Sequence, residues 1–460
     1  MTDLPNELLP ATRRALLHRL AVAQSEGRTP SMVAGVVRDG QPVWSGARSM
    51  VDGHAPTPDV QYRIGSLTKT FVAVLVFRLR DEGLLDLADP LSRHLPGTPA
   101  DGATIAQLLS HSAGLAAETP GPWWERTEGS LRPGLGDLLT AERPLVHPTG
   151  RVHHYSNPGY ALLGALVEQL RGEPWGEVLH REVLAPLGMD RTTLLPEHPH
   201  AGGFAVHPWA DVMLPEPLTD TGRMAPAGQL WSTGADLARW AVFLSAGHAK
   251  VLSADTLAEM RRPAVGPDNG EWTGGYGLGL QLRRHEGRLM YGHNGSMPGF
   301  TAALWISEAD GLAAYALSNA TSGGNTAALA PQLIALTAEH EPRLPEPWRP
   351  QAESADPELL ELTGPWYWGA TPAALRLRPG RVLELTPLNG AGRGSRFRPE
   401  PDGTWTGVEN YYAGETLRVV RHSDGTVGHL DVGSFVYTRE PYGPADAVPG
   451  GVAPEGWQAF

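Results

Sequence analysis

The sequence contains no cysteine, and only two of its 37 basic residues are lysines, Lys69 and Lys250. Without cysteine the chain has no disulfide bond, no thiolate metal site and no cysteine nucleophile. No stretch reaches the ~18 consecutive apolar residues that a membrane-spanning helix needs. Residues 1–7 are polar and acidic and lack the basic and apolar segments of an export signal. We therefore expect a cytoplasmic protein without a membrane partner.

Acidic residues outnumber basic ones, and the formal net charge is −13 at pH 7. A nucleic-acid partner is not expected, since such a chain repels phosphates. The sequence has no His-Glu-x-x-His or Asp-x-Asp pattern, so we expect neither a metal nor another cofactor. With 460 residues, of which 41% are hydrophobic, the chain is long enough for two or three domains and a sizeable core.

Residues 63–77 carry the clearest chemical pattern. They read as a turn at Gly65 followed by an apolar helix, in which Ser66 and Lys69 share one face about one turn apart. An ammonium in a helix that is apolar all round is unfavourable unless it is paired or loses its proton. A lysine of lowered pKa beside a serine hydroxyl can make that serine a nucleophile. The alternative is a serine that caps the helix and a lysine whose end reaches solvent.

The rest of the first 340 residues reads as a mixture of helices and strands. Hydrophobic periodicity predicts helices at 7–26, from 104, at 161–171 and at 326–340, and strands at 32–37, 42–47, 275–280, 289–296, 300–306 and 313–319. The last four strands are expected to form an antiparallel meander. Residues 196–225 show no periodicity and are interpreted as loops.

The composition changes at residues 341–357, where five prolines predict a stiff linker. Beyond the linker only strands are expected, at 374–378, 382–386, 395–398, 404–407, 416–421 and 434–439. Their spacing predicts a small antiparallel barrel or sandwich over residues 358–460, with an irregular tail after 440.

Three clusters occur in a fixed order: Ser66-x-x-Lys69, Tyr155-x-Asn157 and His293-x-Gly295. In that order they resemble the serine β-lactamase and penicillin-binding protein superfamily, in the branch with class C β-lactamases, D,D-carboxypeptidases, D-aminopeptidases and esterases. The Leu-Leu-Ser-His-Ser-Ala-Gly-Leu segment at 108–115 resembles that branch's Leu-Leu-Thr-His-Thr-Ser-Gly-Leu. The similarity covers about residues 10–340. It implies an α/β fold in which the site lies between an antiparallel sheet and a helical lobe.

The resemblance implies catalytic roles for three residues. Ser66 would be the acylated nucleophile, and Lys69 would hold its Oγ and share its proton. Tyr155, with its phenolate favoured by the nearby ammonium, would act as general base and later protonate the leaving group. The backbone N–H groups of Ser66 and Ser296 would form the oxyanion hole. His111 is expected only to fix a loop.

The expected substrate contacts are less specific. Asn157 would bond a substrate amide, and His293 with Gly295 would line the opposite strand edge. Contacts are also predicted from Trp123 and Trp124, whose loop alternatively packs on the surface, and from Asn319. Arg439 of the C-terminal domain is a further candidate, although Arg418 and Arg421 are comparable and each alternatively lies in solvent.

The departure from the β-lactamase pattern directs the choice of substrate. His293-Asn294-Gly295 replaces Lys-Thr-Gly, which weakens the cation that grips a substrate carboxylate, so strong β-lactamase activity is not expected. A lipocalin-like C-terminal barrel resembles those of some D-aminopeptidases and of penicillin-binding-protein-type thioesterases, which release and macrocyclise nonribosomal peptides.

We therefore expect a monomeric serine acyl-enzyme hydrolase or transacylase. Its expected substrate is a small peptide or ester, or a carrier-protein-bound peptidyl thioester. Peptide cyclisation is its sharpest version. The alternatives are a D-aminopeptidase, D,D-carboxypeptidase or esterase that uses water, and an inactive binding protein.

Overall fold

The computed structural model describes residues 7–51, 53–98, 100, 102–127, 145–266, 273–345, 347–348, 356–390, 392–443 and 445–447. The chain divides into two compact units, Met1–Leu344 and Pro345–Phe460. No helix among these described residues is long and apolar enough to cross a membrane.

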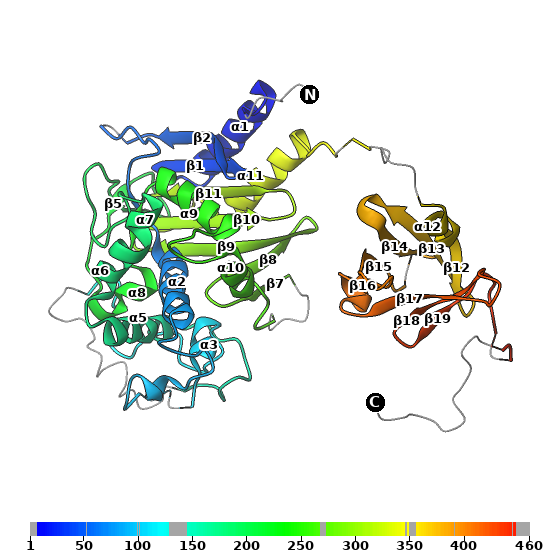
Figure 1. Ribbon diagram of the computed structural model, residues 1–460. Coiled ribbons are helices and arrows are strands. Elements are labelled where there is room, and N and C mark those ends of the chain that lie inside the picture. The colour runs from blue at the N-terminus through cyan, green and yellow to red at the C-terminus, as the bar shows by residue number, and fades with distance from the viewer. Residues whose placement is uncertain are drawn as a thin grey trace. The chain divides into compact units, whose positions relative to one another are not determined.

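The first unit is built on a seven-stranded antiparallel sheet with the order β2-β1-β11-β10-β9-β8-β7 (Figure 1). The strands are β1 Ser31–Arg38, β2 Gln41–Ser49, β7 Gly274–Tyr276, β8 Gln281–His285, β9 Arg288–Met297, β10 Phe300–Ser307 and β11 Leu312–Ser318. Helices α1 Pro10–Glu26 and α11 Thr326–His340 lie side by side against the sheet. The two ends of this unit therefore meet, because α1 and α11 pack against each other on one face of the sheet.

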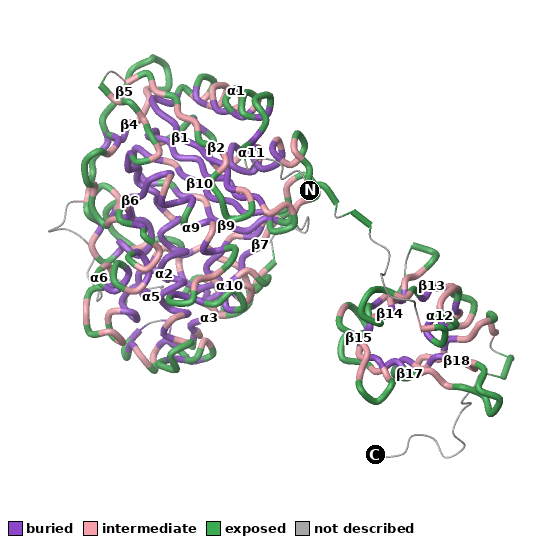
Figure 2. The backbone as a smooth tube through the Cα atoms, turned by 45° about the horizontal axis from the view of Figure 1, so that its top comes forward, coloured by how far each residue is buried: buried purple, intermediate pink, exposed green. Residues whose placement is uncertain are grey.

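Alternation along the strands gives the sheet two apolar faces. On β10, Ala303 and Trp305 pack in the cluster that contains α1 and α11, whereas Leu304 and Ile306 belong to the larger cluster on the other side. Successive side chains of a strand point to opposite faces, so a strand buried on both sides needs apolar residues throughout. Figure 2 shows that the central strands of this sheet are largely buried.

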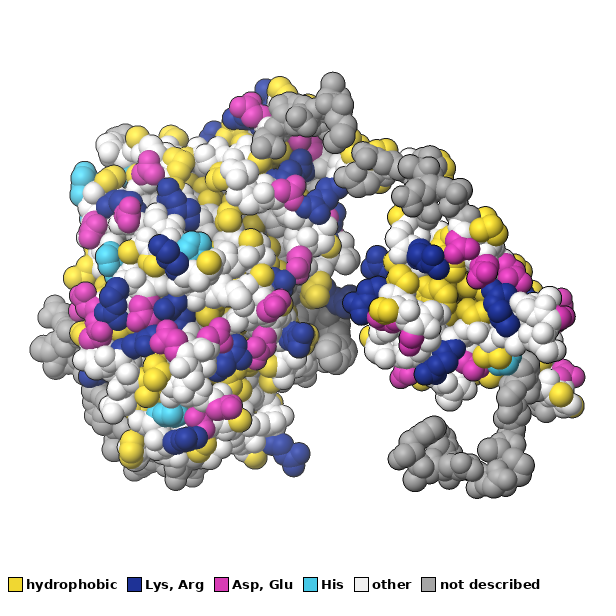
Figure 3. Space-filling model, viewed as in Figure 1, with side chains coloured by type: hydrophobic (Ala, Val, Ile, Leu, Met, Phe, Trp, Pro, Cys, Tyr) yellow, Lys and Arg dark blue, Asp and Glu magenta, His cyan; other side chains and the backbone are white. Residues whose placement is uncertain are grey.

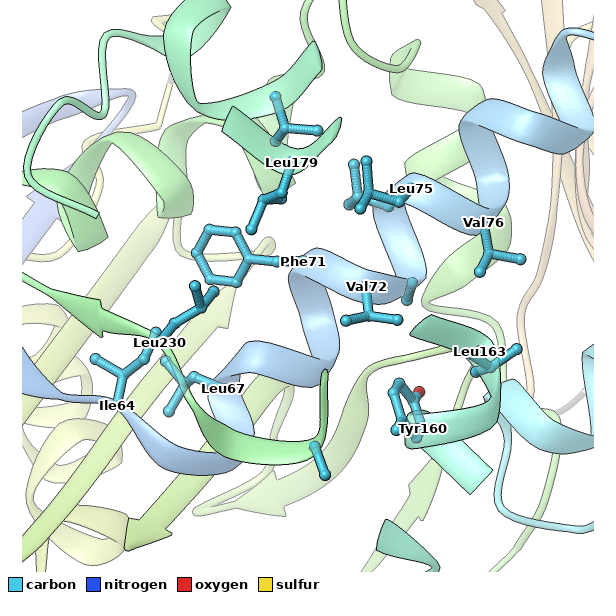
Figure 4. Close-up of a cluster of buried hydrophobic side chains, with 14 of the residues drawn as sticks. Ile64, Leu67, Phe71, Val72, Leu75, Val76, Tyr160, Leu163, Leu179 and Leu230 are labelled. Carbon is cyan, nitrogen blue, oxygen red and sulfur yellow. The ribbon is translucent and has the colours of Figure 1, made fainter. Parts of the chain in front are cut away.

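The larger cluster belongs to the helical part of the unit, with α2 (Thr68–Asp81) at its centre. The other α-helices among the described residues of this unit are α3 Ile105–Leu109, α5 Asn157–Arg171, α6 Trp175–Leu179, α7 Ala185–Leu187, α8 Ala225–Gly228, α9 Gly234–Ala246 and α10 Ala254–Met260. Every residue from Thr68 to Phe77 is buried. Figure 4 shows Phe71, Val72 and Leu75 projecting from α2 into this cluster. Close packing on all sides holds the start of α2 in one position.

Some expectations for this unit were wrong. The strand expected at 275–280 ends at Tyr276, and β8 was not predicted. The left-handed backbone of Gly279, φ +93°, redirects the chain between the two strands. The segment 196–225 is not all loop, because β4 Phe204–Val206 pairs with β5 Met213–Pro215.

The second unit is a nearly closed barrel of eight antiparallel strands in sequence order. They are β12 Gly364–Trp368, β13 Thr371–Arg378, β14 Val382–Pro387, β15 Ser395–Pro399, β16 Trp405–Gly407, β17 Thr416–Arg421, β18 Val427–Val432 and β19 Phe435–Tyr437. Tyr367 and Thr438 exchange backbone hydrogen bonds of 2.7 and 2.9 Å, which join the first strand to the end of the last. Trp366, Phe397 and Tyr412 fill the core, and further hydrophobic side chains are exposed on the face seen in Figure 3.

The barrel confirms the predicted all-β class, with three departures. Strands β12 and β18 were missed, because β12 begins with Gly364-Pro365, which is typical of a turn, and β18 is interrupted by Gly428 and His429. The expectation of strands alone was also wrong, since helix α12 (Pro357–Leu362) precedes β12.

Candidate active site

Ser66 is positioned by a short pair of strands and by one glycine. Strand β3 (Tyr62–Arg63) pairs with β6 (Trp231–Ser232), so the approach to Ser66 is fixed from both sides. Gly65 then turns with φ +53°, and a Cβ there would lie 2.5 Å from the backbone N of Ser296. Only glycine allows this close approach. It brings the first turn of the helix, and with it the backbone of Ser66, next to strand β9.

Lys69 lies one helical turn after Ser66 and is completely buried. Its Nζ is 3.0 Å from Ser66 Oγ, 2.7 Å from Asn157 Oδ1 and 2.6 Å from the carbonyl oxygen of Ala227. Burial lowers the pKa of Lys69 to about 7, against the opposing attraction of Glu118 and Glu125. Near neutral pH the amine is therefore present in both protonation states and can exchange a proton with Ser66 Oγ.

Tyr155 lies directly beside this amine, with Lys69 Nζ 4.8 Å from the centre of its ring. His111 holds the Tyr155 loop, as predicted: its Nδ1 accepts the N–H of Ser156 at 3.0 Å, and its carbonyl oxygen accepts the N–H of His154 at 2.8 Å. The three residues Ser66, Lys69 and Tyr155 thus lie together.

The prediction that Tyr155 rests as a phenolate was wrong. Burial raises the pKa of Tyr155, although a hydrogen bond with Ser66 acts in the opposite direction. The ammonium of Lys69 was expected to favour the phenolate, but that argument omitted the desolvation of Tyr155 itself. The resting side chain is therefore a phenol, and Lys69 is the group whose pKa suits a base at neutral pH.

Asn157, the first residue of α5, is fixed from two sides. Its Oδ1 accepts from Lys69, and its Nδ2 donates to Glu118 Oε1 at 2.6 Å. The other oxygen of Glu118 accepts the indole N–H of Trp124 at 2.8 Å. Sequence reasoning missed Glu118. The only signal was its position between the 108–115 segment and the tryptophan pair.

His293 is buried in strand β9 and uses both ring nitrogens within the protein. Nδ1 is 2.5 Å from the carbonyl oxygen of Asn294 and must donate to it, so Nε2 accepts from the hydroxyl of Tyr276 at 2.9 Å. Burial, followed by the charge of Lys69, lowers the pKa of His293 to about 3. The imidazole is therefore neutral, and it supplies no cation for a substrate carboxylate.

A cavity of 450 Å³ opens beside these groups. It is lined by five predicted site residues, namely Ser66, Tyr155, His293, Gly295 and Ser296. The lining residues that were not predicted include Thr301 and residues 323–327, which lead into α11. A Cβ on Gly295 would lie 1.9 Å from the carbonyl oxygen of Ile64, so this glycine lets β9 pass close to the serine turn.

Three other predicted contacts lie outside the lining of this cavity. Asn319 is buried outside the cavity lining, and its Nδ2 donates to the carbonyl oxygen of Gly202. Trp124 is buried against Glu118, whereas Trp123 is 56% exposed and does not line the cavity. The Nδ2 of Asn319 is thus used within the protein, and a contact of this residue with substrate stays a prediction.

Arg439 belongs to the second unit. Its guanidinium lies 3.9 Å from the ring centre of Trp366 and donates to the carbonyl oxygens of Thr363 and Pro365 at 3.0 Å each. These contacts explain its position within the barrel, and a contact with substrate stays a prediction. Within the described ranges no group of three or more His, Asp or Glu side chains is arranged to hold a metal.

A buried amine between a serine hydroxyl and a phenol defines a serine-nucleophile site of the acyl-transfer class. The chain belongs to the β-lactamase family, whose model matches residues 14–339. Residues 355–439 match a domain of unknown function (DUF7586). Penicillin-binding protein 4 of Amycolatopsis lactamdurans is 30% identical over 380 residues, which cover 75% of this chain and 95% of that protein.

Two solved structures share the fold at 25% identity. A D-stereospecific amidohydrolase from Streptomyces sp. has a TM-score of 0.58, covering 71% of this chain and 98% of that one. A structure of SurE with D-Leu has a TM-score of 0.56, covering 94% of this chain and 100% of that one. The protein is a serine hydrolase of the β-lactamase and penicillin-binding protein family.

Proposed function

We propose that this protein forms an acyl-enzyme on Ser66 with a peptide-like amide, thioester or ester, and transfers the acyl group to an amine or to water. The observation that carries the proposal is the buried Lys69 Nζ, 3.0 Å from Ser66 Oγ, with a pKa of about 7. The intact arrangement of Ser66, Lys69 and Tyr155 argues against a protein that only binds.

The proposed reaction has two halves. Neutral Lys69 accepts the proton of Ser66 Oγ while the oxygen attacks the substrate carbonyl, and the backbone N–H groups of Ser66 and Ser296 receive the oxyanion. The C–N, C–S or C–O bond then breaks, and the phenol of Tyr155 protonates the leaving group and regains a proton from Lys69. In the second half an amine or water attacks the ester on Ser66 and gives up a proton to Lys69, and this proton passes to Ser66 Oγ as the ester bond breaks.

The neutral state of His293 limits the class of substrate. A fixed cation would grip the carboxylate of a β-lactam or of a D,D-peptide, but His293 is neutral and bonded to Tyr276 and Asn294. The likeness to a D-stereospecific amidohydrolase and to SurE with D-Leu supports a substrate that contains a D-residue. The sharpest version of the proposal is a thioesterase that releases and macrocyclises a nonribosomal peptide from its carrier protein. A D-aminopeptidase or esterase that uses water is the alternative.

A peptidyl thioester with a free N-terminus and a C-terminal D-residue separates these versions. Mass spectrometry of the products distinguishes a cyclic peptide from the linear acid, which is heavier by one water. Cyclic product that disappears in Ser66→Ala supports the cyclase, and linear acid alone supports the hydrolase. Turnover that survives in Ser66→Ala, or a fluorophosphonate that leaves Ser66 unlabelled, would refute both.

A further inference from the structure

A second cavity, of 890 Å³, lies beside β2, the edge strand of the seven-stranded sheet. Its lining comes mainly from β2 and from helix α9. The described lining residues of this cavity and of the cavity at Ser66 do not overlap. The volume is within the ~300–1,000 Å³ of typical small-molecule sites. No step of the proposed reaction uses this second cavity.

Gly35 of β1 lets a tyrosine from the next strand reach this cavity. Gly35 pairs with Ser45 of β2 on one side and with Tyr315 of β11 on the other. A Cβ on Gly35 would lie 2.4 Å from both Cζ and the hydroxyl oxygen of Tyr315. The end of the Tyr315 ring therefore lies over Gly35, in the direction of β2. Tyr315 and Ser45 both line the cavity.

The hydroxyl of Tyr315 has no hydrogen-bond partner among the described residues, although the side chain is 3% exposed. Burial raises the pKa of Tyr315, and the negative charge of Asp59 acts in the same direction. The hydroxyl therefore stays protonated and can donate. A buried donor without an acceptor is unfavourable, so a ligand oxygen at this position would gain the bond that the fold leaves unmade.

Apolar side chains form most of the remaining wall. Val36, Trp44 and Phe243 are buried, and Leu187 and Val242, which also line the cavity, are partly buried. An aromatic or aliphatic group that covers these side chains releases the water in contact with them, which favours binding. An apolar wall with a few placed polar groups is typical of small-molecule sites.

The charged groups around the cavity are paired with one another. Arg239 Nη1 lies 2.8 Å from Asp236 Oδ1, and Arg13 Nη1 lies 3.9 Å from Glu7 Oε2. A charged ligand would therefore lose its hydration without meeting an unpaired counterion among the described lining residues. The charge of Asp59 further disfavours an anion beside the tyrosine hydroxyl. These charges favour an uncharged ligand.

We propose that this cavity binds an uncharged small molecule with an aromatic or aliphatic body and one carbonyl oxygen, such as a ketone, an ester or a lactone. The body packs against Trp44 and Phe243, and the carbonyl oxygen accepts a hydrogen bond from the hydroxyl of Tyr315. The site is separate from Ser66 and does not depend on the proposed function.

Binding is measured by ¹⁹F nuclear magnetic resonance, with the protein titrated into dilute 4-fluorobutyrophenone and the line width followed. The matched probe is 1-butyl-4-fluorobenzene, because it has the same body without the carbonyl oxygen. The wild type should bind the ketone about 3- to 10-fold more tightly, which corresponds to one hydrogen bond between uncharged groups. The charged probe 4-(4-fluorophenyl)butyrate should bind more weakly than the ketone.

Tyr315→Phe should bring the ratio of the two affinities close to 1. Tyr62→Phe is the matched control and should keep the ratio, because Tyr62 is buried outside the cavity lining and its hydroxyl bonds to Ser31 and His54. Ser45→Trp fills the cavity from an exposed position and should abolish the preference for the ketone. Without ligand, Tyr62→Phe should lower the melting temperature, whereas Tyr315→Phe should not, because its hydroxyl makes no bond to lose.

Undetectable broadening with the wild type, equal affinity for the two uncharged probes, or a preference that persists in Tyr315→Phe or Ser45→Trp would overturn the proposal. A melting temperature of Tyr315→Phe as low as that of Tyr62→Phe would also overturn it, because the hydroxyl would then be bonded within the protein. Butyrate binding as tight as that of the ketone would contradict an uncharged ligand. None of these results changes fluorophosphonate labelling of Ser66, which tests the proposed function separately.

Discussion

The pH dependence of acylation depends directly on the environment of Lys69. Moving its pKa from 10.5 to about 7 corresponds to about 5 kcal/mol against the buried ammonium. The neutral fraction then rises from about one tenth at pH 6 to about nine tenths at pH 8. We predict that kcat/KM for a p-nitrophenyl ester rises about tenfold between pH 6 and 8 and then levels off, because the neutral amine is the form that accepts the serine proton.

Lysine scarcity provides a matched control for this experiment. Lys250 is the other lysine of the chain and is exposed, so Lys250→Met should show the same inflection near pH 7 as the wild type. Lys69→Met should lose it together with most of the activity. A rate that keeps rising about tenfold per pH unit through pH 9 would show a base with an ordinary lysine pKa and refute the reasoning.

Three further predictions concern neighbouring groups. Gly65→Ala should reduce fluorophosphonate labelling of Ser66 more than 100-fold, because the new Cβ would lie 2.5 Å from Ser296 N. Circular dichroism should still show a folded protein. Normal labelling would contradict the close approach of the two backbones. Tyr155→Phe should lower kcat about 10²- to 10⁴-fold but keep the inflection near pH 7, and loss of the inflection would identify Tyr155 as the titrating base. Because the pKa of Lys69 is lowered on folding, the unfolded chain binds more protons than the folded chain between pH 7 and 10. The free energy of unfolding of the wild type, measured with a denaturant, should therefore rise by about 1.4 kcal/mol per pH unit relative to that of Lys69→Met, from pH 7 upward. A difference that stays constant with pH would count against burial of the charge.

Features that depend on nearby residues in the chain could be predicted from the sequence. The pairing of Ser66 with Lys69 follows from helical spacing, and burial of Lys69 follows from the apolar residues around it. Strands β10 and β11 are apolar except at Thr301, Ser307 and Ser318, which is typical of strands covered on both faces. Gly65 could be placed at a turn for the same local reason.

Features that depend on contacts between residues far apart in the chain could not be predicted from the sequence. Glu118 joins the site through Asn157, 39 positions away, and no local pattern marks that bond. The neutral state of His293 depends on Tyr276 packing against it, and the phenol of Tyr155 depends on how deeply the fold buries it. The resemblance to β-lactamases located these side chains but did not specify their protonation.

Titration of the two lysines by nuclear magnetic resonance measures the protonation of Lys69 most directly. With ¹³C and ¹⁵N labels at lysine, the chain gives two side-chain signals, and Lys250→Met assigns them. We predict that the signal assigned to Lys69 titrates near pH 7. A Lys69 signal that remains that of an ammonium through pH 9 would contradict the account of how Ser66 is activated.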